Sequence, residues 1–282
     1  MTVVTSPGNA AVKAARKLAR RTERARAGEF LVESPEVVRE ALPHLRRLFV
    51  TAEAASREAE LVARAEAAGA TVMVVTPEVL GGLSDTVTPQ GLVGVAALPG
   101  AALDATLDEV CRAGAPLVVA LSQVRDPGNA GAIIRSADAG GADVVVLTRG
   151  SVDPGNPKAV RASAGSVFHL PVVTDADEEA LLAACRARGL QVVAAAPRGA
   201  VPFTDVDFTR PTAVLFGNEA HGLDDAVVEA CDVAAAAPIH AGARPGWTGS
   251  AESLNLAATV AVFVYEAARQ RHGRGGGRAG AA

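Results

Sequence analysis

Residues 117–147 read LVVALSQVRDPGNAGAIIRSADAGGADVVVL, in which two apolar runs flank a polar loop and a helical stretch. The runs predict strands over 117–121 and 143–147, and the stretch between them predicts a helix over about 129–140. Strands without polar alternation are buried on both faces, and a helix is the usual connection between two parallel strands. This part of the chain therefore predicts an α/β fold, a parallel sheet covered by helices.

The same alternation continues to residue 271. Further strands are expected over 170–173, 190–196, 212–216 and 232–238, and further helices over 157–165, 177–188, 222–230 and 252–271. Before residue 98 short strand-like runs also alternate with helices, of which one is expected over 11–26 and another over 53–68. We therefore predict a small α/β domain over 1–98, a linker over 99–115, a parallel-sheet domain over 116–272 and a disordered, low-complexity tail over 273–282.

Positive charge is concentrated at the two ends of the chain. The formal net charge is −4, but residues 1–26 hold seven Lys and Arg against one Glu, a surplus of roughly +6. The segment 269–282 adds four Arg without an acid, so the rest of the chain carries roughly −14. Two basic ends on an acidic body favour localised phosphate contact, although solvated helix faces would give the same count.

Composition disfavours several classes of protein. No apolar run is long enough to span a membrane, and the first ten residues lack the pattern of an export signal. Cys111, Cys185 and Cys231 lie far apart, which predicts reduced thiols in a cytoplasmic protein. The histidines lack ligand spacing, so no metal site is expected. The dinucleotide fingerprint GxGxxG is missing after 117–121, which disfavours a dehydrogenase.

The loop SQVRDPGNAG at 122–131 follows an expected strand and leads into a helix. In open parallel sheets, ligands bind beyond the carboxyl ends of the strands. Asn129 lies near the start of the helix, where it is a candidate cap. Arg135 follows six residues later, nearly two helical turns, so both side chains could face one side.

Two later loops carry similar groups. GNEAHGL at 217–223 places Glu219 between two glycines after a buried strand, where Gly217 would let a ligand approach the backbone. AESLNL at 251–256 opens the last helix, and its Ser253 and Asn255 could be helix caps and nothing more.

Together these stretches resemble the three signature motifs of the SpoU family, also called TrmH-like, of RNA ribose 2′-O-methyltransferases. The matching stretches are DPGNAGAIIRSADAGGAD (126–143), LFGNEAHGLDDAV (215–227) and API…AESLNLA (237–239 and 251–257). The segment DPGNPKAVRASAGSVFHLPV (153–172) is similar to a further stretch of the family. GEFLVESPEVVREAL (28–42) and TPQGLVGVAAL (88–98) are similar to the small L30e-like substrate-binding domain of many members.

The resemblance implies a SPOUT-type fold with a deep trefoil knot, a homodimer and bound S-adenosyl-L-methionine, which composition and periodicity could not show. Carried over position by position, it assigns the reaction to Asn129, Arg135, Glu219, Ser253 and Asn255. It assigns the cofactor to the backbone of Gly217, Ile239 and Leu254, with Ala195 or Ala196 beneath the adenine. The family reading makes Arg135 the base. Because the pKa of a free guanidinium lies above 12, forming the neutral guanidine at pH 7 is costly. Glu219 is therefore an alternative proton acceptor, or the group that orients Arg135.

The expected RNA contacts are basic residues outside these motifs. Lys158 and Arg161 stand three apart at a helix start, and Arg16, Arg20 and Arg24 belong to the basic N-terminus; these five could hold phosphates. Aromatic residues are only 3% of the chain, so phosphate contacts should dominate and make binding depend on salt. An insertion relative to the family, 242–250, carries the single Trp247 and could be a lid or stacking platform.

The sequence therefore predicts S-adenosylmethionine-dependent 2′-O-methylation of structured RNA. Ribosomal 23S RNA is favoured over tRNA because of the resemblance of the N-terminal domain. The alternatives are a tRNA ribose 2′-O-methyltransferase, a base nitrogen as the methyl acceptor, and a non-catalytic RNA-binding or ribosome-assembly factor with this fold. No membrane partner and no metal are expected.

Overall fold

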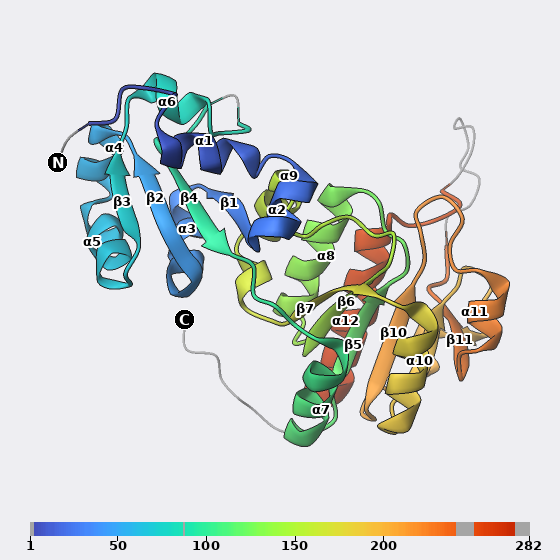
Figure 1. The fold of residues 1–282 in the computed structure, drawn as a ribbon. Helices are drawn as coiled ribbons and strands as arrows, with labels where there is room; N and C mark the ends of the chain where they lie inside the picture. Colours follow the sequence, from blue (N-terminus) through green and yellow to red (C-terminus); the bar gives the residue numbers. More distant parts are fainter. Residues whose placement is uncertain (1–2, 87, 241–250, 274–282) are drawn as a thin grey trace. The chain divides into compact units, whose positions relative to one another are not determined.

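The computed structural model describes residues 3–86, 88–240 and 251–273 of the chain. Its contacts divide the chain into two compact units, both drawn in Figure 1. The first unit consists of Met1–Pro99 and Asp153–His169, and the second of Gly100–Val152 and Leu170–Ala282. The segment 153–169, which we expected in the second domain, thus packs with the first unit.

A seven-stranded sheet forms the centre of the second unit. Its strands lie in the order β7-β6-β5-β10-β8-β11-β9, and each neighbouring pair is parallel. The predicted parallel α/β domain is confirmed. The strands are β5 (Leu117–Leu121), β6 (Val144–Thr148), β7 (Val172–Ala176), β8 (Gln191–Ala195), β9 (Val201–Pro202), β10 (Thr212–Phe216) and β11 (Val233–Ala236).

The register of this sheet brings the ends of its central strands level. Phe216, the last residue of β10, pairs with Leu121 at the end of β5 and with Ala195 at the end of β8. The loops that follow these strands therefore start side by side at the carboxyl edge, where open parallel sheets bind their ligands.

Helices cover both faces of the sheet, because successive residues of a strand point to opposite sides. On one face, Val118 packs in a core cluster with Leu107 of α7 and Leu181 of α10. On the other face, Phe216 meets Phe263 of α12 edge-on, with ring centroids 5.4 Å apart. The helices are α7 (Leu103–Ala113), α8 (Pro127–Ala139), α10 (Glu178–Ala187), α11 (Asp225–Glu229), α12 (Leu256–Gly273) and the 3₁₀ helix η3 (Phe203–Asp205).

The first unit is built on a mixed sheet in the order β1-β4-β2-β3, in which β4 is antiparallel to β1 and β2 while β2 and β3 are parallel. Its strands are β1 (Glu29–Glu33), β2 (Leu45–Val50), β3 (Thr71–Val74) and β4 (Leu92–Ala97). Its helices are α1 (Ala10–Lys17), α2 (Arg21–Ala27), α3 (Pro35–Ala41), α6 (Pro77–Gly81), α9 (Pro157–Ser163), and the 3₁₀ helices η1 (Leu42–His44) and η2 (Ser166–Phe168). The helix expected over 53–68 is divided into α4 (Ala52–Arg57) and α5 (Ala59–Ala67).

The helix expected over 11–26 is also divided, because residues 18–20 separate α1 from α2. The Arg24 side chain folds back from α2, and its Nη1 donates to the carbonyl oxygens of Leu18 and Ala19 at 2.8 and 2.9 Å. A helix end leaves its last carbonyls without partners inside the helix. Arg24 therefore stabilises the turn that sequence periodicity had not predicted.

Candidate active site

The loop after β10 turns back on itself immediately after the strand. The Asn218 N–H donates to the Gly222 carbonyl at 3.0 Å, and the Gly222 N–H donates to the Asn218 carbonyl at 2.8 Å. A Cβ on Gly217 would lie 2.0 Å from the carbonyl carbon of Gly222. Gly217 is therefore required because its own loop closes on it. The expectation was different, namely that the missing side chain lets a ligand approach the backbone.

The same loop presents the Glu219 carboxylate to the loop after β5. Asn129 Nδ2 donates to Glu219 Oε1 at 3.1 Å, and the backbone N–H groups of Asp126 and Arg125 approach the two carboxylate oxygens at 3.3 and 3.4 Å. One carboxylate thus joins residues that are 90 to 94 positions apart in sequence. The pairing of β5 with β10 makes this possible, because it starts both loops at the same level.

Asn255 extends this arrangement to the third motif. Its Oδ1 accepts from the N–H groups of Ala257 and Ala258, at 2.9 and 3.4 Å, at the start of α12. Its Nδ2 donates to Asn129 Oδ1 at 3.2 Å. Asn255 is therefore both a helix cap and a member of the site. We call the hydrogen-bonded side chains of Glu219, Asn129 and Asn255 the acid–amide chain.

Asp126 caps α8, and Asn129 does not. Asp126 Oδ1 accepts from the Asn129 N–H at 2.8 Å, and Pro127 occupies the first position of the helix. The expectation that Asn129 is the cap was wrong. A capping Asp followed by Pro is a known pattern for the start of a helix and could have identified Asp126. Because Asp126 serves the helix, the Asn129 amide is left for Glu219 and Asn255.

The hydrogen bonds of Glu219 set its protonation state. Partial burial raises the pKa of this carboxyl, but the hydrogen bonds from Asn129 and from backbone N–H groups outweigh burial and leave the pKa below its ordinary value. A carboxylate that is stabilised in this way is a weak proton acceptor. Glu219 is therefore suited to hold the loops in place rather than to remove a proton.

Arg135 and Ser253 lie outside the acid–amide chain. Arg135 is exposed on α8, and its guanidinium makes no hydrogen bond or ion pair with the described residues. Six residues correspond to roughly 1.7 helical turns, so Arg135 and Asn129 leave α8 in directions about 120° apart, and they do not share a face as expected. Ser253 is exposed just before α12, also without a hydrogen bond to the described residues.

The residues assigned to the cofactor lie at the same edge of the sheet. Ala195 ends β8, the Ala196 N–H donates to the Ala235 carbonyl at 2.9 Å, and both alanines are half-buried. Ile239, after β11, and Leu254, before α12, are 39% and 44% exposed. These two are among five large apolar side chains that the described residues leave exposed. Small residues beside uncovered apolar side chains fit the walls of an adenine site.

Two further residues connect the loops, Gln123 and Asn218, and the sequence points to neither of them. Gln123 has a left-handed backbone conformation, φ +49°, which a residue with a side chain adopts at a cost. Its carbonyl accepts from Asn218 Nδ2 at 2.7 Å, a second link between the same two loops. Both line a small open pocket together with Ser122, Arg125, His221, Gly222 and Asp224. The positive φ and this contact depend on the folded loops, so periodicity gave no signal for them.

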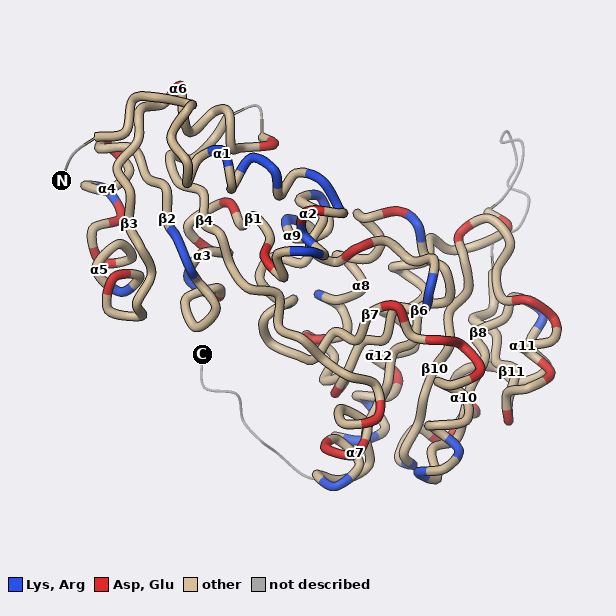
Figure 2. Tube along the Cα trace, in the orientation of Figure 1, with Lys and Arg blue, Asp and Glu red and all other residues tan. Residues whose placement is uncertain are grey.

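The residues assigned to RNA contact lie in the first unit and differ in exposure. Arg16 and Arg20 are exposed along the run of basic residues at α1 and α2 in Figure 2. Arg24 is only 6% exposed, and its Nε lies 2.7 Å from Asp153 Oδ2. The structure corrects the assignment of Arg24, which is an internal residue and cannot grip a phosphate.

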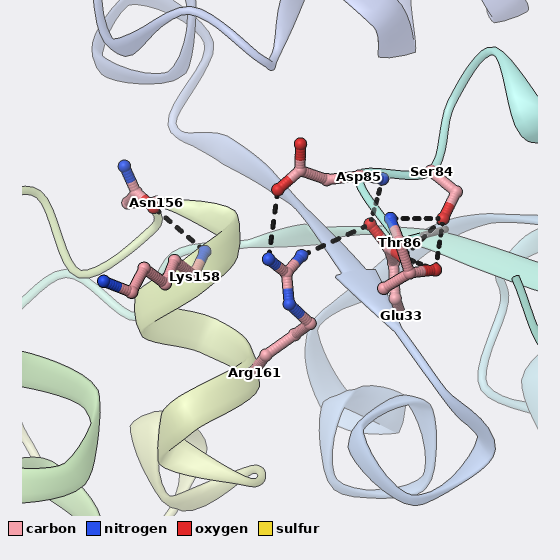
Figure 3. Close-up of polar contacts among 7 residues, drawn as sticks. All are labelled: Glu33, Ser84, Asp85, Thr86, Asn156, Lys158 and Arg161. Atoms are coloured by element: carbon pink, nitrogen blue, oxygen red, sulfur yellow. Dashed lines mark hydrogen bonds and ion pairs between the residues drawn. The ribbon is translucent and has the colours of Figure 1, made fainter. Parts of the chain in front are cut away.

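Arg161 also has acidic partners. Its Nη2 lies 3.0 Å from Asp85 Oδ2, and its Nη1 lies 4.0 Å from Glu33 Oε1 (Figure 3). Two carboxylates around one guanidinium leave a negative local charge, which argues against a phosphate site there. Lys158 is exposed at the start of α9 and points away from Arg161 in Figure 3. The two do not form the shared basic face that their spacing predicted.

The three cysteines are not suited to covalent chemistry. Burial raises the pKa of the Cys185 thiol to about 12 and that of Cys231 to about 11, and it also raises the pKa of Cys111. All three are free thiols, which their pKa values keep protonated and unreactive.

Within residues 3–86, 88–240 and 251–273, no cluster of three or more His, Cys, Asp or Glu could hold a metal ion. No helix in these ranges is long and apolar enough to cross a membrane. Trp247 and the insertion 242–250 lie outside the described residues.

Comparison with known families matches both units. Residues 116–265, more than half of the chain, match the SpoU rRNA Methylase family. The chain belongs to this family. Residues 9–94 match the MRM3-like substrate binding domain. The family and the class of enzyme expected from the three motifs, an RNA methyltransferase, are thereby confirmed.

Relatives of known activity are similar over nearly their whole length. The chain is 31% identical over 265 residues to the 23S rRNA (guanosine(2553)-2′-O)-methyltransferase RlmP of Bacillus subtilis (strain 168), covering 94% of this chain and 98% of that protein. It is 33% identical over 267 residues to the 23S rRNA (uridine(2479)-2′-O)-methyltransferase of Streptomyces viridochromogenes, covering 90% and 87%. The AdoMet-bound rRNA methyltransferase from Sinorhizobium meliloti has a TM-score of 0.81 at 31% identity, covering 95% of this chain and 97% of that one.

Replacing Glu219 by Gln should cost stability in a way that depends on pH. Because the pKa of Glu219 is lowered in the folded chain, its contribution is complete above the ordinary carboxyl range and is lost as pH falls through the lowered value. We expect Glu219→Gln to be less stable than the wild type by about 1 kcal/mol or less at pH 7, and the difference to shrink in acid. Urea titrations at pH 7 and at pH 4 measure it. A difference that grows in acid would contradict the assigned protonation state.

Proposed function

We propose that this chain transfers the methyl group of S-adenosyl-L-methionine to a ribose 2′-hydroxyl of 23S ribosomal RNA. The acid–amide chain is the observation that carries the proposal, because it connects one residue from each of the three motif loops at the carboxyl edge of the sheet. The two relatives named above act on 23S rRNA and resemble this chain over both units. Their similarity supports ribosomal RNA as the substrate.

The residues at the sheet edge fit the cofactor. Ile239 and Leu254 supply exposed apolar surface, and Ala195 and Ala196 leave room for a flat ring. Backbone groups at Gly217, Ile239 and Leu254 would complete its binding. When bound, the cofactor supplies a sulfonium methyl group as the electrophile.

The chain's own residues would position the attacking oxygen. The acid–amide chain fixes the loops around the reacting groups, and precise positioning can supply several kcal/mol of rate acceleration. Arg135 is exposed and without a carboxylate partner among the described residues, so its guanidinium is available to hold the ribose 2′-oxygen or a neighbouring phosphate. Since the pKa of Glu219 is lowered, we assign removal of the 2′-hydroxyl proton to Arg135 rather than to Glu219. To accept that proton, the Arg135 guanidinium must first release one of its own to solvent, and it returns to the charged form when it takes the ribose proton. Ser253, exposed beside Leu254, is proposed to contact substrate.

A second feature concerns how RNA is held. Lys13, Arg16 and Lys17 are exposed on α1 at the i, i+3 and i, i+4 spacings that bring side chains together, and Arg20 is exposed just before α2. Arg21 and Arg26 are also exposed, and Glu23, which lies between them in sequence, pairs with Arg26 at 2.8 Å. We call the exposed cations Lys13, Arg16, Lys17, Arg20, Arg21 and Arg26 the basic face. We assign RNA phosphates to it, with Lys158 as a further contact.

The family resemblance implies further properties of this chain. A homodimer would cover Val262 and Tyr265, which are 37% and 55% exposed on α12. A trefoil knot would lie in the second unit. Action on ribosomal RNA would place the enzyme in the cytoplasm.

Two other functions, a tRNA methyltransferase and a non-catalytic assembly factor, fit the structure less well. A tRNA methyltransferase would have little use for the first unit, whose match to a substrate-binding domain favours the larger RNA. A non-catalytic assembly factor would have no need of hydrogen bonds among the motif side chains. Calorimetry with S-adenosylmethionine separates this last alternative, because an assembly factor would show no binding.

The purified chain should methylate unmodified 23S rRNA and leave tRNA unmodified, and mass spectrometry of nuclease fragments should place the methyl group on a ribose. Arg135→Ala and Arg135→Lys should both lose turnover by about 100-fold or more, the range of general-base contributions. Both variants should bind S-adenosylmethionine within twofold of the wild type. Full methylation by Arg135→Lys would remove the assignment of Arg135 as the base, and methylation of tRNA alone would overturn the proposed substrate.

The basic face should determine how RNA binding depends on salt. Neutralising Arg16 and Arg20 together to Gln should weaken binding to 23S rRNA and lower the slope of log affinity against log salt by roughly 1.5, since each lost phosphate contact removes about 0.7–0.9. The matched control replaces Arg46 and Arg64, two exposed cations elsewhere in the same unit, with the same change of charge. Equal slopes for the two double variants would show that net charge, rather than the basic face, binds RNA.

A further inference from the structure

Residues 153–169, which we call the coupling segment, connect two strands of the second unit but fold with the first. The segment leaves the parallel sheet after β6 and returns to it before β7. Its contacts nevertheless belong to the unit of Met1–Pro99. The chain therefore passes between the units three times, at 99/100, 152/153 and 169/170.

An internal ion pair holds the start of the coupling segment. Arg24 and Asp153 are 6% and 16% exposed, with Nε and Oδ2 2.7 Å apart. The other oxygen of Asp153 accepts from the Gly155 N–H at 2.8 Å, which shapes the turn before α9. Because Arg24 also binds the carbonyls that end α1, one guanidinium connects the helices of the basic face to the coupling segment.

A second ion pair holds α9, and its two charges are exchanged between the segment and the rest of the unit. Here the coupling segment supplies the cation, Arg161, and the N-terminal part of the unit supplies Asp85 and Glu33 (Figure 3). Glu33 is buried, and its carboxylate also accepts from the Ser84 and Thr86 hydroxyls, at 2.7 and 3.2 Å. Of the two partners of Arg161, Glu33 is therefore itself fixed, whereas the Asp85 carboxylate is 64% exposed and makes the shorter contact, at 3.0 Å.

The end of the coupling segment is held by rings and by a third polar contact. Phe168 stacks on Phe30 and on His44, with ring centroids 5.6 and 5.5 Å apart. His169 Nε2 lies 3.0 Å from Glu40 Oε2. The segment is thus attached to the rest of the first unit at its start, middle and end.

We propose that the coupling segment joins RNA binding to methyl transfer, and that Arg161 and Arg24 are positioning residues for the reaction. The inference rests on the proposed function. RNA held on the basic face can react only when its ribose stays near the groups at the sheet edge, and a single flexible connection would give a low effective concentration there. With the segment attached, three passages of the chain join the units instead of one.

The proposal predicts a separation of kcat from affinity. Loss of the Arg161 contacts leaves the basic face and the sheet edge intact, so 23S rRNA and S-adenosylmethionine still bind. The bound ribose then reaches the reacting groups less often, so kcat falls.

Arg161→Gln is the main variant, because Arg161 is partly exposed whereas replacement of the internal Arg24 risks unfolding. We expect kcat to fall at least tenfold, with dissociation constants for 23S rRNA and S-adenosylmethionine within twofold of the wild type. Arg161→Lys, which keeps the charge, should retain kcat within threefold. The matched control is Arg39→Gln, which removes an ion pair with Glu58 of 2.8 Å in the same unit and should leave kcat unchanged. An unchanged kcat for Arg161→Gln, or an equal fall of kcat and both affinities, would overturn the proposal.

Amide hydrogen exchange supplies a readout that needs no catalysis. Addition of 23S rRNA transcript should slow exchange over 144–152 and 170–176, the parts of the second unit that flank the coupling segment, and Arg161→Gln should abolish this slowing. If the wild type methylates no RNA, the proposed function fails while this measurement still tests the coupling. If RNA binds the wild type without slowing exchange in these two stretches, the coupling proposal is wrong.

Discussion

The candidate site depends on the Glu219 carboxylate, which accepts three hydrogen bonds. Its donors are the Asn129 amide and the backbone N–H groups of Asp126 and Arg125, so one side chain fixes the loop after β5 against the loop after β10. Asn255 joins the third motif by donating to Asn129 while its oxygen caps α12. These bonds also fix the orientation of the Asn129 amide, because its nitrogen faces a carboxylate and its oxygen faces a donor.

The sheet makes this arrangement possible before any side chain contributes. Parallel pairing with Phe216 opposite both Leu121 and Ala195 starts the loops level at one edge. Gly217 then permits the loop after β10 to close on Gly222, which carries Glu219 toward α8. The chemistry proposed here, transfer of a methyl group to an oxygen, requires no covalent intermediate with the protein. It depends instead on holding two reactants in line, for which a rigid set of loops is suited.

Much of the second unit could be predicted from sequence, because its signals are local. Apolar runs separated by helices predicted the parallel sheet, and the resemblance of three loops to the SpoU motifs assigned Asn129, Glu219 and Asn255 to the site. The residues that were assigned incorrectly are those whose partners are distant in sequence. Arg24 and Arg161 look like surface cations in a basic helix, and only the fold shows that Asp153, Asp85 and Glu33 neutralise them. Asn129 is not the helix cap that the sequence suggests, because Asp126 fills that role.

We propose that Asn255 acts on the reaction through Asn129, because their side chains form one hydrogen-bonded chain with Glu219. A double-mutant cycle on kcat/KM tests it most directly, with Asn129→Ala, Asn255→Ala and the double variant assayed on 23S rRNA. If the residues act as a unit, the double variant loses no more activity than Asn129→Ala alone, because the contact is already broken. If the loss of kcat/KM in the double variant equals the product of the losses in the two single variants, the account is contradicted, since the two amides then act independently.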